Sequence, residues 1–234
     1  KFYKNFNDKI IPEMIKNSIY LGDIESLDEE GKKKIKKYFK KTIFPMLTPM
    51  VFDNLHSFPI LMNKVLIYGV VTKSSDNTNK RKISFIQIPV NIPRFFEYKI
   101  DEKIIFIPIE KIIHKYIKKF FRNVTIESIS LFRIIRNGDF TLEESEDIET
   151  NFLEELKQKL KDRKFSRVVR IEIHEEYDDH LVSKLKDILD VGDKNLFEVK
   201  KESIIDLTSL NQIINYEEFS ELLSEREKPI IPVS

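Results

Sequence analysis

The run of β-branched residues at 124–136, VTIESISLFRIIR, constrains the fold more than any other part of the sequence. Isoleucine, valine and threonine favour extended backbone over helix, and the turn sequence RNGD at 136–139 ends the run. Two apolar runs at residues 65–72 and 82–90 flank a polar stretch, which predicts a hairpin. Shorter strands are expected at residues 94–98, 103–107, 167–174 and 196–199.

Helices are predicted between these strands from capping signals and apolar spacing. Ser26 and Glu29 have the spacing of a capping box, which predicts a helix that runs to about residue 41 and buries Ile35 and Phe39. Pro108 is suited to the first position of another helix. Further helices are expected at residues 141–163, after a second capping box at 141–144, and at residues 178–190, 207–215 and 216–223.

The start of the chain also predicts a helix, over residues 1–17, because Phe2, Phe6, Ile10 and Met14 recur every four residues across Pro12. The order of elements predicts an α+β fold, with a mixed β-sheet and helices packed mostly on one side, preceded by one N-terminal helix. A chain that begins inside a helix and ends in an extended, proline-rich segment suggests an excised piece. The alternative is a complete protein that has lost its initiator methionine.

Composition narrows the classes of function. There are 40 Lys+Arg against 39 Asp+Glu, a net charge of +1, so a globally basic nucleic-acid or membrane binder is not indicated. The lack of cysteine excludes disulfides, thiolate nucleophiles and cysteine zinc sites. Five glycines and no Gly-rich motif argue against a glycine-built phosphate loop. No apolar run approaches the roughly 18 residues of a membrane span and no signal peptide opens the chain, so we expect a soluble cytoplasmic protein.

Histidine and acidic residues gather only at residues 174–180, HEEYDDH. This cluster could bind a hard metal ion such as magnesium. We favour the alternative, the exit of a strand and the start of a helix capped by Asp178 or Asp179, because capping alone explains the acidic residues and their spacing. His114 is expected to be a half-buried helix residue rather than a ligand, because no second ligand lies near it in the sequence.

Basic residues supply the candidate binding groups. The lysine-dense helix at residues 32–41, with Lys33 and Lys37, could hold a polyanion or simply form a solvated face. Arg133 and Arg136 lie three apart on one strand and should point to opposite faces unless a bulge intervenes, so both cannot serve one ligand. Arg136 at the strand end could meet a phosphate, or each arginine could pair with an acid such as Asp139 or Glu172, since one fork serves both partners.

Several segments in order resemble the bacterial polyphosphate kinase family of the phosphohistidine type. They are IFPMLTP at residues 43–49, HSFP at 56–59, IPVNIPRF at 88–95, FIPIE at 106–110, FRIIRNGDF at 132–140 and RKFSRVVRIE at 163–172. The resemblance covers nearly the whole chain. It implies that residues 1–17 are the last helix of a truncated N-terminal helical domain. Residues 18–234 would then be the head domain, ending in a connector to absent catalytic domains.

The same resemblance implies a whole enzyme that transfers the terminal phosphate of ATP reversibly to polyphosphate, using ATP and magnesium. Its phosphohistidine and catalytic arginines have no counterpart here, so we expect no catalytic residue, cofactor or metal site in this fragment, which should be inactive alone. The head is expected to self-associate, through an apolar surface such as Phe95, Phe96, Phe120 or Phe121. No specific nucleic acid is expected as a partner.

A second interpretation treats the chain as a stand-alone polyanion-binding module for polyphosphate or RNA. It would use the helix at residues 32–41 together with Arg94, Arg133 and Arg136. Binding of this kind weakens steeply as salt concentration rises. The 18 phenylalanines lie mostly in apolar runs, so the interleaved aromatic residues typical of single-strand binders are lacking.

Overall fold

The computed structural model describes residues 2–53, 56–74, 81–137, 166–201 and 203–222. The strands are β1 (Ile19–Leu21), β2 (Met50–Phe52), β3 (Leu66–Ser74), β4 (Arg81–Gln87), β5 (Phe95–Ile100), β6 (Lys103–Pro108), β7 (Val124–Arg136), β8 (Val168–His174) and β9 (Leu196–Val199). The α-helices are α1 (Phe2–Asn5), α2 (Ile11–Lys16), α3 (Glu29–Tyr38), α4 (Ile109–Tyr116), α6 (Asp179–Leu189) and α7 (Asn211–Ile214). Short π or 3-10 turns are η1 (Phe6–Ile10), η2 (Ile24–Ser26), η3 (Phe39–Ile43), η4 (Phe44–Met46), η5 (Ile117–Phe120), η6 (Asp193–Asn195), η7 (Leu207–Leu210) and η8 (Glu217–Leu222).

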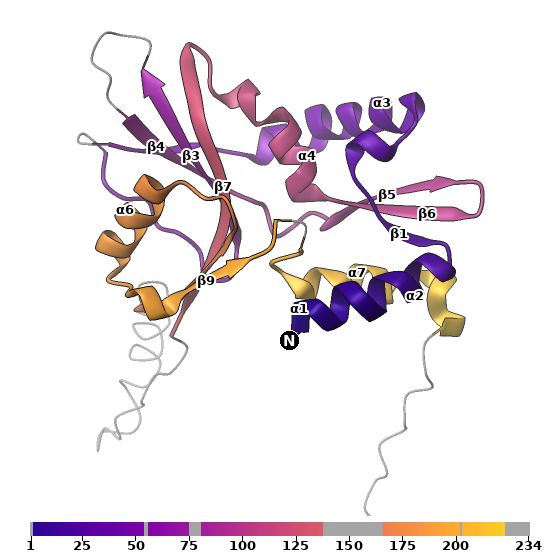
Figure 1. Ribbon diagram of the computed structural model, residues 1–234. Helices are drawn as coiled ribbons and strands as arrows, with labels where there is room; N and C mark the ends of the chain where they lie inside the picture. Colours follow the sequence, from indigo (N-terminus) through magenta and orange to yellow (C-terminus); the bar gives the residue numbers. More distant parts are fainter. Residues whose placement is uncertain (1, 54–55, 75–80, 138–165, 202, 223–234) are drawn as a thin grey trace, which may run out of the picture.

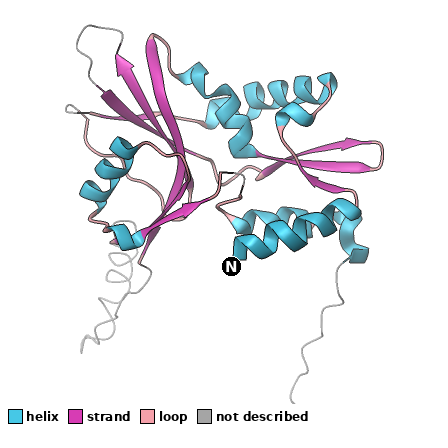
Figure 2. Cartoon of the chain, viewed as in Figure 1, coloured by secondary structure: helices cyan, strands magenta, loops and turns pink. Residues whose placement is uncertain are grey.

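Strands of the described residues form two sheets, both mixed (Figures 1 and 2). The large sheet has the order β2-β4-β3-β7-β8-β9, antiparallel except for the parallel pair β8–β9. The small sheet has the order β1-β6-β5, with β1 parallel to β6. The α+β class, the mixed sheet and the N-terminal helix are confirmed. The expected single sheet divides in two because β5 and β6 pair with β1, from near the start of the chain.

The hydrophobic core follows from the alternation of side chains along β3. Tyr68 and Val70 face α3 and α4, whereas Ile67 and Val71 face α6 on the opposite side of the large sheet. Figure 1 shows α4 and α6 on the two sides of this sheet. Both faces of β3 are therefore covered, which explains why its sequence is a continuous apolar run rather than an alternating one. A third cluster fills the space between the small sheet, the N-terminal helix and α7.

The N-terminal segment is helical as predicted, but its register differs. The amide of Ile11 binds the carbonyl of Phe6, which makes η1 a π turn just before Pro12. Proline has no amide hydrogen and its ring clashes with a carbonyl four residues earlier, so the wider turn accommodates it. The extra residue shifts the apolar face: Phe6, Ile11 and Met14 pack on the core, while Ile10 is 42% exposed.

A second π turn precedes a second proline. η3 ends where the amide of Phe44 binds the carbonyl of Phe39, and Pro45 follows. The helix predicted to about residue 41 thus continues as a π turn, and Ile35, Phe39 and Ile43 are fully buried. At two distant places in the sequence, a π turn thus accommodates the proline that follows it.

The predicted N-cap of α3 is wrong by two residues. Asp28, not Ser26, accepts a hydrogen bond from the Gly31 amide at 2.7 Å. The same carboxylate accepts the Tyr98 hydroxyl at 2.8 Å, which links α3 to β5, and this bond raises the pKa of Tyr98 to about 12. Ser26 instead donates to the carbonyl of Asp23 within η2. Leu27, between the two candidates, is buried, and the helix begins at Glu29, directly after Asp28.

Several other elements agree with the sequence, whereas the short strands β1 and β2 were not predicted. β3 and β4 form the expected hairpin, β7 spans residues 124–136, and Asp178 caps α6 by accepting the Leu181 amide at 3.1 Å. α6 approaches β3 closely at Gly69, where a Cβ would lie 2.5 Å from Leu181 Cδ2. The helix predicted at residues 141–163, its capping box, Gly138 and Asp139 lie outside the described residues.

Candidate functional site

The exposed lysines of α3 and η3 form the basic surface that was predicted from the sequence. Lys33, Lys36, Lys37, Lys40 and Lys41 are exposed. Within the described residues none of the five has a carboxylate partner, whereas Lys32 pairs with Glu29 at 3.1 Å and Lys34 with Glu30 at 2.7 Å. We call these five residues the lysine face. Lys33 and Lys37 are one helical turn apart and lie on the same side.

The short turn η5, which follows α4, adds a lysine that the sequence analysis did not single out. Lys119 Nζ lies 4.9 Å from the ring centroid of Tyr116 and 5.4 Å from that of Phe39, in η3. Lysines at the ends of two helices also oppose the negative ends of their dipoles. The aromatic rings and the helix dipoles both stabilise positive charge at this place. The lysines are therefore stabilised without a bound anion.

Arg133 is bound by two carboxylates. Its Nε donates to Glu172 Oε2 at 2.6 Å, and its Nη1 donates to Asp206 Oδ1 at 3.1 Å. Glu172 lies directly opposite Arg133 in the β7–β8 ladder and also binds Arg170 Nη2 at 2.7 Å. This geometry favours the pairing interpretation for Arg133.

Arg136 has a different environment. Its Nη1 donates to the carbonyl of Ser166 at 2.6 Å and its Nη2 to that of Leu61 at 3.3 Å. Burial lowers the pKa of this guanidinium. A register shift lies between Ile135 and Arg136, so the unbroken strand on which the opposite-face prediction depended is interrupted just before Arg136. Among the described residues the two arginines share no partner, so these contacts do not join them in a single site.

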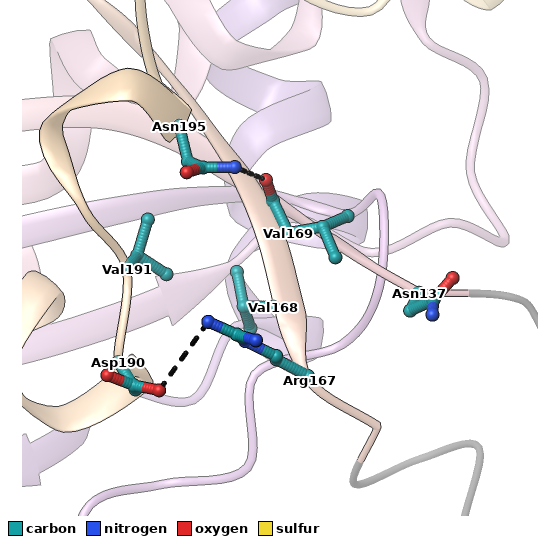
Figure 3. A pocket seen from close by; sticks show the side chains of 7 residues that line it. All are labelled: Asn137, Arg167, Val168, Val169, Asp190, Val191 and Asn195. Carbon is teal, nitrogen blue, oxygen red and sulfur yellow. Dashed lines mark hydrogen bonds and ion pairs between the residues drawn. The ribbon is translucent and has the colours of Figure 1, made fainter.

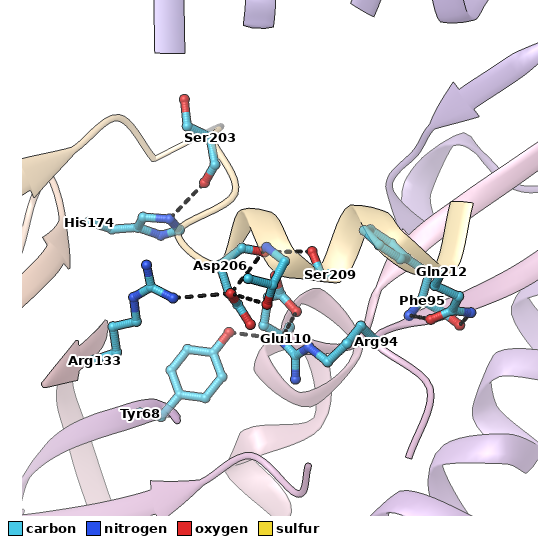
Figure 4. A network of polar contacts seen from close by, with 11 residues as sticks. Tyr68, Arg94, Phe95, Glu110, Arg133, His174, Ser203, Asp206, Ser209 and Gln212 are labelled. Carbon is cyan, nitrogen blue, oxygen red and sulfur yellow. Dashed lines mark hydrogen bonds and ion pairs between the residues drawn. The ribbon is translucent and has the colours of Figure 1, made fainter. Parts of the chain in front are cut away.

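Charged and polar groups converge where the two sheets meet (Figure 4). Arg94 Nη2 lies 3.1 Å from Glu110 Oε2, and the Tyr68 hydroxyl donates to the Glu110 carbonyl at 2.8 Å. Burial raises the pKa of Glu110, and the charge of Arg94 partly opposes that rise. We call Arg94, Glu110, Arg133, Glu172 and Asp206 the sheet junction. With Arg170 included, this region has three cations, Arg94, Arg133 and Arg170. They face three carboxylates, those of Glu110, Glu172 and Asp206, so the charges balance within the region.

Residues 203–212 link this junction to the small sheet. His174 Nε2 lies 2.9 Å from the Ser203 carbonyl. Gln212 lies at the outer edge of β5, where its Oε1 accepts the Phe95 amide at 2.9 Å and its Nε2 donates to the Phe95 carbonyl at 3.0 Å. A side-chain amide thus occupies the position of a neighbouring strand.

Histidines do not assemble into a metal centre. His56 Nδ1 lies 2.7 Å from Asp53, and His174 binds a backbone carbonyl. His114 is exposed on α4, whereas a half-buried position was expected. His180 is in the first turn of α6. Within the part of the chain that the structure describes, no group of three or more His, Cys, Asp or Glu residues could hold a metal ion. The cluster at residues 174–180 serves as strand exit and helix cap.

One pocket of about 290 Å³ opens between β8 and the turn after α6 (Figure 3). Its lining residues are Asn137, Arg167, Val168, Val169, Asp190, Val191 and Asn195. Asn195 Nδ2 donates to the Val169 carbonyl, and Arg167 and Asp190 are an exposed pair at 3.7 Å. These polar groups bind each other, and nothing in the lining set matches a catalytic arrangement.

Comparison with known proteins decides the family. The family described as "Polyphosphate kinase middle domain" matches residues 30–213. The chain belongs to the polyphosphate kinase family. A polyphosphate kinase from Campylobacter coli is 32% identical over 228 residues, which are 97% of this chain and 32% of that relative. A polyphosphate kinase from Halalkalibacterium halodurans is 31% identical over 212 residues, 90% of this chain and 30% of the relative.

The fold also matches a solved structure of the family. The crystal structure of polyphosphate kinase from Porphyromonas gingivalis superposes with a TM-score of 0.73 at 15% identity, over 98% of this chain and 32% of that one. The chain therefore spans about a third of the length of the polyphosphate kinases that it matches. Among the described residues, no helix is long and apolar enough to cross a membrane.

Proposed function

We propose that this chain is a non-catalytic head and dimerisation portion of a polyphosphate kinase. In this proposal residues 18–234 form the head, and residues 1–17 are the last helix of a preceding helical domain. The whole enzyme would transfer the terminal phosphate of ATP reversibly to polyphosphate, with ATP and magnesium bound elsewhere, in the cytoplasm where ATP is plentiful. The family match over most of the chain, against a third of its relatives' length, supports this assignment.

The observation that carries the scaffold role is the internal pairing of the sheet junction. Arg133 and Arg94 direct their forks at carboxylates of the same chain. A phosphate-transfer site needs cations aimed at a substrate, because catalysis of that reaction depends on electrostatic stabilisation of transferred charge. Here the charged groups instead join Arg94, just before β5, to α4, and join β7 to β8 and the segment after β9.

The test is a direct activity measurement on the purified 234-residue chain. With ATP, magnesium and a polyphosphate primer we expect no polyphosphate synthesis and no ATP formation in the reverse direction. A polyphosphate kinase of full length is the positive control. Turnover by the isolated chain above a boiled sample would overturn the scaffold role.

Polyanion binding by the lysine face is the second candidate, supported by the absence of carboxylate partners at Lys33 and Lys37 among the described residues. We expect polyphosphate to bind in low salt and to be released as salt rises. Lys33→Glu/Lys37→Glu should weaken binding at least about tenfold, since each contact contributes to a salt-dependent sum. Lys184→Glu/Lys194→Glu, the same charge change at two exposed lysines elsewhere, is the control. Equal affinity of both double variants would contradict this candidate.

The phenylalanines expected to contribute to self-association are largely covered by the core. Phe95 is 2% exposed, and Phe96, Phe120 and Phe121 are partly buried against the core. Of these residues Phe95 and Phe96 lie on β5, a strand at the edge of the small sheet.

A further inference from the structure

The outer edge of β5 combines open backbone groups with an ordered charge pattern. The Ile109 amide binds the carbonyl of Arg94, so the backbone groups of Arg94 face β6. Those of Phe95 face away from β6 and meet Gln212. Because this direction alternates along a strand and the β5–β6 register has no shift, the amides and carbonyls of Glu97 and Lys99 also face outward. Within the described residues no hydrogen bond satisfies these groups.

Unpaired edge strands are templates for another strand, and proteins usually block them. Gln212 blocks the edge at Phe95 only. Beyond it, the side chains of Glu97 and Lys99 are exposed, with Lys99 53% accessible. The part of the edge without hydrogen-bond partners therefore begins after Phe95, the residue that Gln212 binds. It ends at the turn that contains Asp101.

We propose that this edge pairs with the same edge of a second copy, as two antiparallel β5 strands related by a two-fold axis at Tyr98. The proposal rests on the self-association in the proposed function and names its surface. In this register Glu97 lies opposite Lys99 of the second copy, and Lys99 opposite Glu97. Each such pair directs its outward amides and carbonyls at each other and exchanges both hydrogen bonds.

Charge selects this register over its neighbours. Pairing centred on Glu97 would place two carboxylates opposite each other, and pairing centred on Lys99 would place two ammonium groups opposite each other. Both arrangements are destabilising, whereas opposite charges in register stabilise a sheet. Registers that use the edge groups of Phe95 compete with Gln212. The chain is thus self-complementary in one register.

The other face of β5 supports the same pairing. Phe96 and Ile100 are partly buried against the core, and the register at Tyr98 sets Phe96 opposite Ile100 of the second copy. The existing contacts of the charged residues remain compatible. Gln212 uses Glu97 Oε1 only, and Lys99 gives Glu218 two of the three donors that an ammonium carries.

The test uses charge reversal and mixing, read by sedimentation velocity of the 234-residue chain. Glu97→Lys alone and Lys99→Glu alone should each raise the dimer dissociation constant about tenfold or more, because each places like charges opposite each other twice. Glu97→Gln, which only removes the attraction, should have a smaller effect. An equimolar mixture of the two reversed variants should recover dimers, since every pair is then of opposite sign. Glu175→Lys, an equal charge change at an exposed residue after β8, should leave association unchanged.

Each outcome decides the proposal. Pairing through β5 would be overturned if both Glu97→Lys and Lys99→Glu dimerised as well as the wild-type chain. It would also be overturned if the two variants stayed monomeric when mixed. Neither result would affect the head assignment. A wild-type chain that stays monomeric at high concentration would overturn both this pairing and the self-association on which it rests. The activity test of the head assignment is independent of either result.

Discussion

The sheet junction and the lysine face use the same kinds of side chain in opposite ways. At the junction, Arg133 and Glu172 are 16% and 8% exposed in their side chains and hold each other at 2.6 Å. On the lysine face, Lys33 and Lys37 extend into solvent. Buried charges must be paired because an uncompensated one is costly, whereas exposed charges cost little wherever they stand. The junction charges therefore specify structure, whereas the exposed ammonium groups of the lysine face have no carboxylate partner within the described residues.

The largest effect should come from breaking the junction. Arg133→Ala leaves Asp206 without its arginine and Glu172 with Arg170 alone, so we expect a loss of about 3–5 kcal/mol in the free energy of unfolding. Urea denaturation measures it. Arg133→Lys keeps the positive charge but not the two-pronged guanidinium. Its free energy of unfolding should lie between those of the wild-type chain and Arg133→Ala. A loss below about 1 kcal/mol would show that the junction charges do not hold the sheets together.

Arg136 should give an intermediate effect. Arg136→Met keeps the bulk but removes two hydrogen bonds to the carbonyls of Leu61 and Ser166, which predicts a loss of about 1–2 kcal/mol by the same measurement. If Arg136→Met costs as much as Arg133→Ala, pairing with carboxylates is not what separates the two arginines.

A pH dependence of stability is expected from the junction, through Glu110. Burial raises the pKa of Glu110 in the folded state above its usual value, so the folded chain binds this proton more tightly than the unfolded chain does. The stability from this site is therefore full below the usual carboxyl pKa, and it is lost as pH rises through the raised value. Glu110→Gln should remove that part of the pH profile of unfolding, measured from about pH 4 to pH 7. An unchanged profile would mean that Glu110 does not titrate with folding.

The smallest effect should come from the lysine face. Lys33→Ala/Lys37→Ala should change the free energy of unfolding by no more than about 0.5 kcal/mol, because neither side chain has a partner among the described residues. A larger loss by urea denaturation would mean that this face contributes to the fold, and it would remove the contrast with the junction.

Sequence patterns predicted the elements that depend on local periodicity. β7 matches its predicted bounds, and Asp178 caps α6, because strand alternation and cap chemistry act over a few residues. The N-cap of α3 was misplaced because Ser26 and Asp28 are both of residue types that favour N-caps, and only the folded chain shows that Asp28 accepts the Gly31 amide. Contacts such as Arg133 with Asp206 could not be predicted, since only the folded chain brings these residues together.

The candidate site shows the same limit. The sequence placed Lys33 and Lys37 on an exposed helix side, because charged residues rarely enter a core. It left two interpretations open for Arg133, and Glu172 in the opposite strand register favours pairing. Gln212 gave no signal at all, because glutamine is an ordinary surface residue until its amide meets the edge of β5.

In each π turn, the additional residue in the turn and the proline that follows it depend on each other. In each, one additional residue and the proline after it are matched: Phe6–Ile10 with Pro12, and Phe39–Ile43 with Pro45. Deleting a residue from either turn would press the proline ring against a backbone carbonyl and rotate the preceding face by about 100° relative to the core. Replacing the proline would leave a widened turn with nothing to accommodate. Related chains should therefore lose or retain both together.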